Sequence, residues 1–286
     1  MGAERTHYRV FRSGSKTYFN SSLFFPAEVR GDVFALYGFV RVADDFVDGV
    51  PQDAEGFYAF RDRYRSAMEG RAAGDDIIDP FVELSRRRGF EPAWTEAFLR
   101  SMELDLTKRV YRTIDETLEY IYGSAEVIGL YMARILDLPD ASLDAAMMQG
   151  RAMQYINFIR DVAEDNRLGR TYLPLYETSL PDLQEASVRS DPREFVRFIR
   201  SEVERYKGWQ ARAEEGYVFI PKRVLVPVKT ASDMYDWTAH VIRDDPFVVY
   251  QRKVKPSRPR ILASVLGNAI RLPGKEQSGE SVSRGA

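Results

Sequence analysis

Apolar side chains recur along most of this chain at steps of three and four residues, the spacing of one face of an α-helix. Alternating strand patterns bounded by Asn-Gly or Asp-Gly turns are missing. Glycine and proline fall mainly between the periodic segments. We therefore expect an all-α fold in one domain, because no linker divides the chain. The pattern predicts helices near 26–49, 52–69, 77–88, 92–107, 115–136, 142–168, 191–215, 230–244 and 258–271, and a short strand is compatible with the valine- and proline-rich segment 216–229.

Composition narrows the class of protein. Residues 273–286 are polar and rich in glycine and serine, so we expect a disordered tail after a domain spanning residues 1–272. A net charge of −2 gives no reason to expect nucleic acid as a partner. The absence of cysteine excludes disulfides, thiol catalysis and cysteine-ligated metals. The first residues lack the apolar core of a signal peptide, and no stretch approaches about 20 apolar residues, so we expect a cytoplasmic protein that can still contact a membrane surface peripherally.

The segment "RVADDFVDG" at residues 41–49 carries acidic residues among apolar ones. On a helix, Asp44 and Asp48 lie one turn apart, about 6 Å along the axis. Like charges at this spacing cost a few tenths of a kcal/mol, so the pair does not stabilise the helix by itself. We call these two residues the first aspartate pair.

A second aspartate pair, Asp161 and Asp165, follows within "QYINFIRDVAEDNRLGRTYLP" at residues 154–174. Asn157 lies one turn earlier on the same predicted face, and Gln154 is close to it. Each pair has a neighbouring arginine, Arg41 or Arg160, and each lies among apolar side chains. One acidic pair would ordinarily be a solvated helix face, but two pairs on largely apolar helices indicate a shared partner, because unpaired buried charge is very costly.

The residue types indicate what that partner is. Only two histidines, His7 and His240, are present, which does not favour zinc. Clustered carboxylates and an amide oxygen suit a hard cation such as Mg²⁺, with Mn²⁺ as an alternative. There is no glycine-rich phosphate loop, and the spacing of "DDFVDG" is not that of an EF-hand. These observations predict two acidic helix faces across a cavity, holding Mg²⁺ ions that bridge to a diphosphate.

The motifs "ALYGFVRVADDFVD" and "QYINFIRDVAEDNRLGRTYLP" resemble the signatures of the squalene/phytoene synthases, which are head-to-head prenyltransferases. The resemblance extends from about residue 14 to residue 255, and it is closest to the phytoene synthases. It implies the isoprenoid synthase fold, a helical bundle around a central apolar cavity. The metal ligands implied by the resemblance are Asp44, Asp48, Asn157, Asp161 and Asp165.

The resemblance also implies roles for other side chains. The four aspartates are implied to be catalytic, together with two tyrosines that line the reaction centre, Tyr37 and Tyr120. The implied substrate-binding residues are Ser15, Thr17, Arg41, Gln154, Arg160, Tyr235 and Arg252. The chain departs from the family pattern at Ala125-Glu126, where the family more often has Ala-Gly, and this departure leaves the length of the bound prenyl chain open.

The implied activity joins two geranylgeranyl diphosphates through a cyclopropyl diphosphate to phytoene, a step of carotenoid biosynthesis. Condensation of farnesyl diphosphate to squalene or dehydrosqualene is the alternative, and a non-catalytic helical interaction protein is the second alternative. No nicotinamide fingerprint is present, so we expect no nicotinamide cofactor. The intact aspartate pairs favour an enzyme. Oligomeric state, product isomer and the proton acceptor stay open at this point.

Overall fold

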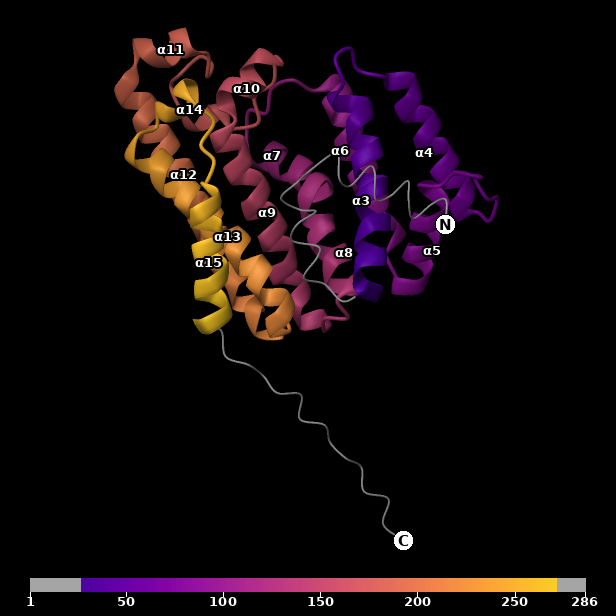
Figure 1. Cartoon of the computed structure of the whole chain (residues 1–286). Coiled ribbons are helices and arrows are strands. Elements are labelled where there is room, and N and C mark those ends of the chain that lie inside the picture. The colour runs from indigo at the N-terminus through magenta and orange to yellow at the C-terminus, as the bar shows by residue number, and fades with distance from the viewer. Residues whose placement is uncertain (1–26, 272–286) are drawn as a thin grey trace.

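The computed structural model describes residues 27–271, which form a bundle of helices (Figure 1). Within this range no β-sheet forms, and the extended segments meet only in an isolated parallel bridge between Val110 and Thr171. The predicted all-α fold is thereby confirmed. The expected disordered tail and two predicted substrate-binding residues, Ser15 and Thr17, lie outside the described residues. None of the helices in residues 27–271 is both long and apolar enough to cross a bilayer.

Most of the helices follow one another with short connections, and the longest connection, residues 168–184, joins α10 to α11. Their bounds are α3 (Ala27–Asp48), α4 (Ala54–Met68), α5 (Ile78–Arg88), α6 (Pro92–Thr107), α7 (Ile114–Ile121), α8 (Val127–Ile135), α9 (Leu143–Arg160), α10 (Val162–Arg167), α11 (Glu185–Ser190), α12 (Pro192–Glu215), α13 (Lys222–Asp244), α14 (Val248–Gln251) and α15 (Arg258–Arg271). A π-helical turn, η1 (Tyr122–Glu126), joins α7 to α8, and 3₁₀ turns occur at η2 (Asp140–Ser142), η3 (Leu175–Glu177) and η4 (Gly216–Phe219).

The structure differs from three of the predicted segments, and it adds the short helices α11 and α14, which were not predicted. The segment 216–229 contains no strand, so that expectation was wrong: η4 and the start of α13 occupy it. Pro227 costs α13 a backbone hydrogen bond, and burial of Val224 and Leu225 offsets that cost. The predicted helix 115–136 contains the π-helical turn, and the predicted helix 142–168 is interrupted at Asp161.

Two hydrophobic clusters hold the bundle together. The first joins α3, α4, α5, α6 and α8, and the ring of Phe39 stacks on that of Phe81 with 3.9 Å between centroids. The second joins α7, α9, α12 and α13 around fully buried side chains such as Tyr155 and Phe195. Because α3 belongs to one cluster and α9 to the other, the two predicted acidic segments are carried by different halves of the core.

Helix α9 approaches η1 very closely at a glycine. A Cβ atom on Gly150 would lie 2.2 Å from the carbonyl oxygen of Ala125. No side chain fits at this distance, so glycine is required for the contact. The contact fixes α9 against the preceding helical layer, and α9 then carries the second acidic segment to the same end of the bundle as the C-terminal end of α3 (Figure 1).

Candidate active site

The first aspartate pair lies at the C-terminal end of α3. The buried residues Phe39, Ala43 and Val47 recur at helical spacing and fix which face of α3 meets the core. Asp44 and Asp48 lie at the edge of that face and are only partly exposed.

Arg41 forms ion pairs with the acidic residues on the exposed side of this segment. Its Nη1 donates a hydrogen bond to Asp44 Oδ2 at 2.9 Å. Its guanidinium also pairs with Asp45, whose side chain is more exposed than that of Asp44. Arg41 thus offsets part of the negative charge on α3 and restrains the Asp44 carboxylate.

The second aspartate pair lies where α9 ends and α10 begins. Asp161 itself is outside both helices, yet the backbone N–H of Asp165 still donates to the Asp161 carbonyl at 2.9 Å, so the one-turn spacing is kept. The guanidinium of Arg160 donates two hydrogen bonds to the Asp161 carboxylate, from Nε at 2.8 Å and from Nη2 at 2.5 Å. Lys253 Nζ lies 3.3 Å from the same carboxylate and also pairs with Glu164. The second pair is therefore surrounded by cationic groups.

Arg170 bonds the first aspartate pair and lies near the second. Its Nη1 donates a hydrogen bond to Asp48 Oδ1 at 2.8 Å, and its Nη2 donates one to the carbonyl of Val47 at 3.0 Å. Arg170 and Asp48 are 122 residues apart in the sequence. Its positive charge also lowers the pKa of Asp165, against stronger effects that raise it. One buried guanidinium therefore bonds the end of α3 and acts electrostatically on Asp165 of α10.

Beneath Arg170 lies a carboxylate that bonds two tyrosines. Asp105, on α6, is fully buried and accepts hydrogen bonds from the hydroxyls of Tyr120 at 2.6 Å and Tyr172 at 2.7 Å. Arg170 Nη1 lies 3.9 Å from the same carboxylate. The bridge between Val110 and Thr171 holds the strand-like segment that carries Arg170 and Tyr172. The predicted reaction-centre residue Tyr120 is thus part of a buried polar cluster, which we call the Asp105 cluster (Asp105, Tyr120, Arg170 and Tyr172).

Burial, together with a neighbouring carboxylate, raises the pKa of one aspartate in each pair. Burial, reinforced by Asp48, raises the pKa of Asp44 to about 7. Burial, reinforced by Asp161, raises the pKa of Asp165 to about 8. A carboxylate in either position is poorly compensated by the protein alone. Both sites are arranged to gain stability from an added cation.

Asn157 supplies an independent indication of a missing ligand. Its Oδ1 is buried, and in the described part of the chain it has no hydrogen-bond partner. An orphaned amide oxygen one turn before Asp161 fits a coordinating oxygen for a hard cation. No three histidine or carboxylate side chains among residues 27–271 are grouped closely enough to hold one ion. A hard cation held by these residues would therefore take much of its shell from water or substrate oxygens, as Mg²⁺ ordinarily does.

The remaining predicted site residues lie at different distances from this centre. Tyr37 is half-buried on α3, one turn before Arg41, and burial raises its pKa. Gln154 is half-buried on α9, one turn before Asn157.

Tyr235, on α13, is close enough to Arg160 to raise the pKa of that guanidinium further. Arg252 is exposed just after α14, and the adjacent Lys253 makes the contact with Asp161.

The sequence did not point to Asp105, Arg170 or Tyr172. Arg170 and Tyr172 stand inside the second motif, but their spacing gives no sign that they meet a carboxylate on a distant helix. In "FLRSMELDL", Asp105 shares a helix face with the apolar residues Phe98 and Met102, and this position is the one signal that could have marked it as a buried partner. A narrow hollow beside this cluster is lined by Phe158, Val162, Asp165, Asn166, Arg170, Thr171, Tyr172, Leu173 and Leu183. The apolar cavity expected to hold prenyl chains stays a prediction.

Comparison with solved structures identifies the fold. The fold is similar to that of a squalene synthase, HpnC, from Alicyclobacillus acidocaldarius, with a TM-score of 0.77 and 22% identity over 86% of this chain and 95% of that one. It is also similar to a dehydrosqualene synthase solved in complex with a ligand, with a TM-score of 0.80 and 19% identity over 93% and 96% of the two chains. The protein therefore has the all-α isoprenoid synthase fold.

Sequence comparison gives the family. A model of the squalene/phytoene synthase family matches residues 11–260, and the chain belongs to that family of prenyltransferases. It is 30% identical to a 15-cis-phytoene synthase from a Paracoccus species over 88% of this chain and 86% of that protein. It is 28% identical to a 15-cis-phytoene synthase from Enterobacter agglomerans over 87% and 89% of the two chains.

The raised pKa values predict how the cation-free protein responds to pH. Asp44 and Asp165 bind protons more tightly in the folded than in the unfolded state. Their contribution to stability is therefore present at acid pH and lost as pH rises from about 4 to about 8. In EDTA at pH 8, we expect Asp44→Asn or Asp165→Asn to stabilise the protein by on the order of 1 kcal/mol, or about 2–4 °C in Tm. Differential scanning calorimetry between pH 5 and 8 measures this gain.

Asp45→Asn is the matched control, because Asp45 pairs with the same arginine but is more exposed. Its Tm at pH 8 should stay within about 1 °C of wild type, as expected for a surface substitution. A loss of Tm in Asp44→Asn at pH 8 would contradict the electrostatic account of the first pair.

Proposed function

We propose that this protein condenses two molecules of geranylgeranyl diphosphate, head to head, to phytoene. The observation that supports this most strongly is the contact of Arg170 with Asp48 of the first pair, across 122 residues of sequence, while the same guanidinium lies close enough to Asp165 of the second pair to lower its pKa. A single acidic helix face would be compatible with solvation. Two acidic segments at one end of the bundle, with a buried amide oxygen one turn before Asp161 that lacks a partner among the described residues, suit a diphosphate bound through divalent cations.

The proposed metal ligands are Asp44, Asp48, Asn157, Asp161 and Asp165. Bound Mg²⁺ or Mn²⁺ supplies neutralisation of the charge that develops on a departing diphosphate. The chain itself contributes Arg160 and Lys253, which hold the Asp161 carboxylate in place and add positive charge beside it. Ser15, Thr17, Gln154, Tyr235 and Arg252 are proposed as further substrate contacts.

Departure of the diphosphate leaves an allylic cation, which must meet the second prenyl chain before it meets water. Aromatic faces stabilise such a cation by about 2 kcal/mol or more when desolvated. We assign this role to Tyr37 and Tyr120. The double bond of the second chain then attacks, a proton leaves to close the cyclopropane, and a second ionisation, rearrangement and proton loss give the hydrocarbon.

The Asp105 cluster limits what Tyr120 can do in these steps. Burial, together with the negative charge of Asp105, raises the pKa of the Tyr120 hydroxyl well above its usual value. Tyr120 therefore stays protonated at neutral pH, with its proton directed to Asp105. Its role is to present a neutral aromatic face and a fixed oxygen, and a phenolate base is excluded at this position.

The product assignment rests on the named sequence relatives. Proteins at 28–30% identity over most of both chains are named 15-cis-phytoene synthases, whereas the structures named for squalene and dehydrosqualene synthases are 19–22% identical and show the fold. Squalene or dehydrosqualene formation from farnesyl diphosphate is the second candidate, favoured by those two structural likenesses.

Incubation of the purified protein with Mg²⁺ and either geranylgeranyl or farnesyl diphosphate tests the proposal. Hydrocarbon extracts are separated by chromatography with mass detection, and released diphosphate is measured in parallel. We expect a forty-carbon hydrocarbon from geranylgeranyl diphosphate and no product when EDTA replaces Mg²⁺. A thirty-carbon hydrocarbon from farnesyl diphosphate alone would assign the second candidate function. The absence of product and diphosphate with both substrates would favour a non-catalytic protein.

A further inference from the structure

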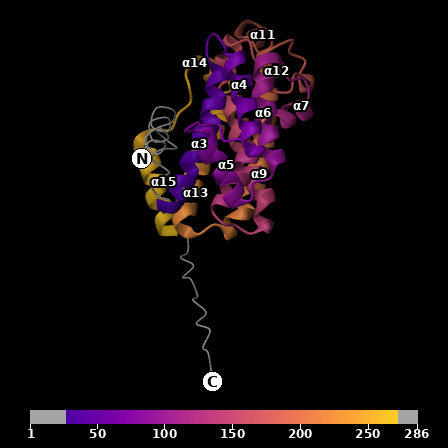
Figure 2. The same cartoon turned by 90° about the vertical axis from the view of Figure 1, so that its right-hand side faces the viewer.

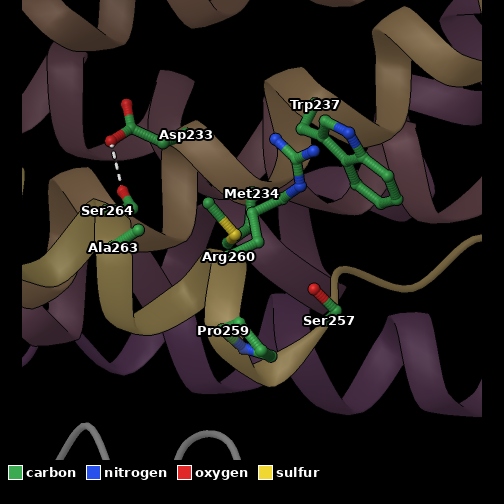
Figure 3. A pocket seen from close by; sticks show the side chains of 8 residues that line it. All are labelled: Asp233, Met234, Trp237, Ser257, Pro259, Arg260, Ala263 and Ser264. Carbon is green, nitrogen blue, oxygen red and sulfur yellow. Dashed lines mark hydrogen bonds between the residues drawn. The ribbon is translucent and has the colours of Figure 1, made fainter.

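Helix α15 is attached to the molecule through its polar side chains. It lies at the margin of the bundle beside α13 (Figures 1 and 2). The Asp233 carboxylate of α13 accepts hydrogen bonds from Ser264 Oγ at 2.8 Å and Asn268 Nδ2 at 2.7 Å. The guanidinium of Arg260 lies 4.8 Å from the ring centroid of Trp237 (Figure 3). These contacts fix which face of α15 points inward.

The outward face of α15 is apolar. Leu262, Leu266 and Ile270 follow one another at one-turn spacing and are 63%, 64% and 82% exposed. A surface helix normally buries its apolar stripe and exposes its polar one, and α15 does the reverse. We call these three side chains the α15 ridge. A continuous exposed ridge of this kind marks an interaction surface.

The chain around the ridge is strongly basic. Residues 246–271 contain no aspartate or glutamate, although the whole chain carries a net charge of −2. The basic residues in this segment are Arg252, Lys253, Lys255, Arg258, Arg260 and Arg271. Lys253 is engaged with Asp161 and Glu164, while Lys255, Arg258 and Arg271 are exposed. An apolar ridge within a basic segment is complementary to an anionic surface that has an apolar interior.

Charge argues against the other occupants of the ridge. In a two-fold dimer through α15, the same basic segment of both copies would meet, and like charges would oppose association. Residues 1–26 carry four basic residues and one acidic residue, so their charge is also unfavourable for covering this face. An anionic lipid bilayer can bury the ridge among its acyl chains and pair its phosphates with the basic residues.

We propose that α15 docks this protein on anionic lipid membranes, with the α15 ridge inserted among acyl chains and the neighbouring basic residues on lipid phosphates. The docking is argued from α15 alone, and its purpose rests on the proposed function: a prenyl diphosphate substrate and a hydrocarbon product both partition into bilayers. The helix would lie in the membrane interface, as amphipathic helices with basic flanks do.

Vesicle flotation of the full-length protein tests the docking directly. Vesicles of phosphatidylglycerol and phosphatidylcholine should float the wild-type protein, and vesicles of phosphatidylcholine alone should float at least tenfold less. The triple variant L262S/L266S/I270S should lose at least tenfold of its partitioning to the anionic vesicles. The double variant R258Q/R271Q should bind more weakly, with a smaller dependence on salt.

Matched controls use exposed residues elsewhere. Val218 and Tyr176 are 67% and 70% exposed, so V218S and Y176S should partition like wild type. Circular dichroism checks that every variant keeps its helix content. Failure of the wild type to float with anionic vesicles, or equal flotation of the triple variant, would overturn the proposal. A dimer that is lost in the triple variant, without flotation of the wild type, would assign the ridge to a second copy instead.

The outcome is separable from that of the proposed function. With detergent-dispersed geranylgeranyl diphosphate, the triple variant should form product at the wild-type rate, because the ridge lies outside the candidate active site. Wild-type flotation with no product from either protein would leave the docking standing and would overturn the proposed function.

Discussion

Replacing Asp161 with asparagine is expected to lower turnover by at least about a hundredfold, on the scale of losing one charge-stabilising group in an active site. The carboxylate is held by two bonds from Arg160 and lies 3.3 Å from Lys253 Nζ. Asparagine keeps the shape but removes the charge that we propose binds the cation. Steady-state release of diphosphate from geranylgeranyl diphosphate measures the loss, and circular dichroism should show unchanged helix content.

Glu164→Gln is the control for this substitution. Glu164 also pairs with Lys253, but its side chain is far more exposed than that of Asp161. Turnover of this variant should stay within about threefold of wild type, because exposed ion pairs contribute little. Equal losses in the two variants would assign the effect to Lys253 rather than to a cation site, and unfolding of Asp161→Asn would make that aspartate structural.

Replacing Asp105 with alanine is expected to destabilise the protein by about 3 kcal/mol or more, because buried groups that lose their partner cost about 1–3 kcal/mol each. The substitution leaves the hydroxyls of Tyr120 and Tyr172 without their acceptor, and Arg170 loses a nearby negative charge. Urea unfolding monitored by circular dichroism measures the change. Turnover of the folded fraction should also fall, because Arg170 contacts Asp48.

Two comparisons separate the Asp105 cluster from a general packing defect. Tyr172→Phe removes one donor and keeps the ring, so it should cost about 1 kcal/mol, the net value of a hydrogen bond. Asp62→Ala removes an exposed aspartate that pairs with Arg61, and it should change stability by less than about 0.5 kcal/mol. If Asp105→Ala were no more destabilising than Asp62→Ala, the cluster would not be a stabilising element.

Local spacing predicted the helices well, because helical periodicity is a property of neighbouring residues. Arg41 and Asp44 are three residues apart, and Arg160 and Asp161 are adjacent, so their ion pairs follow from the helix and the chain alone. The break at Asp161 was not predicted, because a single residue outside helical geometry leaves the periodicity of its flanks unchanged.

Long-range partners could not be predicted in the same way. The bond between Tyr172 and Asp105 joins residues 67 apart, and no spacing rule links α6 to the segment after α10. The helical start of α13 was missed because the propensities of valine and proline favour other structures, and burial of Val224 and Leu225 overrides them. At Arg252 and Lys253 the sequence offered two adjacent cations, and tertiary packing decides that Lys253 contacts Asp161.

The departure at Ala125-Glu126 has a structural consequence. Glu126 is fully buried at the end of the π-helical turn and accepts a bond from Arg151 Nε at 2.7 Å. The Arg151 guanidinium in turn lies 5.4 Å from the ring centroid of Trp209. An ion pair thus stands where the family more often has a glycine, and the length of the prenyl chain that fits beside it is decided by the product assay.

Calorimetric titration with inorganic diphosphate tests most directly whether the two aspartate pairs act together on one ligand. We expect wild-type protein to bind diphosphate in the presence of Mg²⁺ and to lose at least tenfold in affinity in EDTA. Asp48→Asn and Asp161→Asn, which alter different helices, should each abolish the Mg²⁺-dependent part of the affinity. Binding that is indifferent to Mg²⁺, or that is lost in one variant and intact in the other, would contradict a shared site.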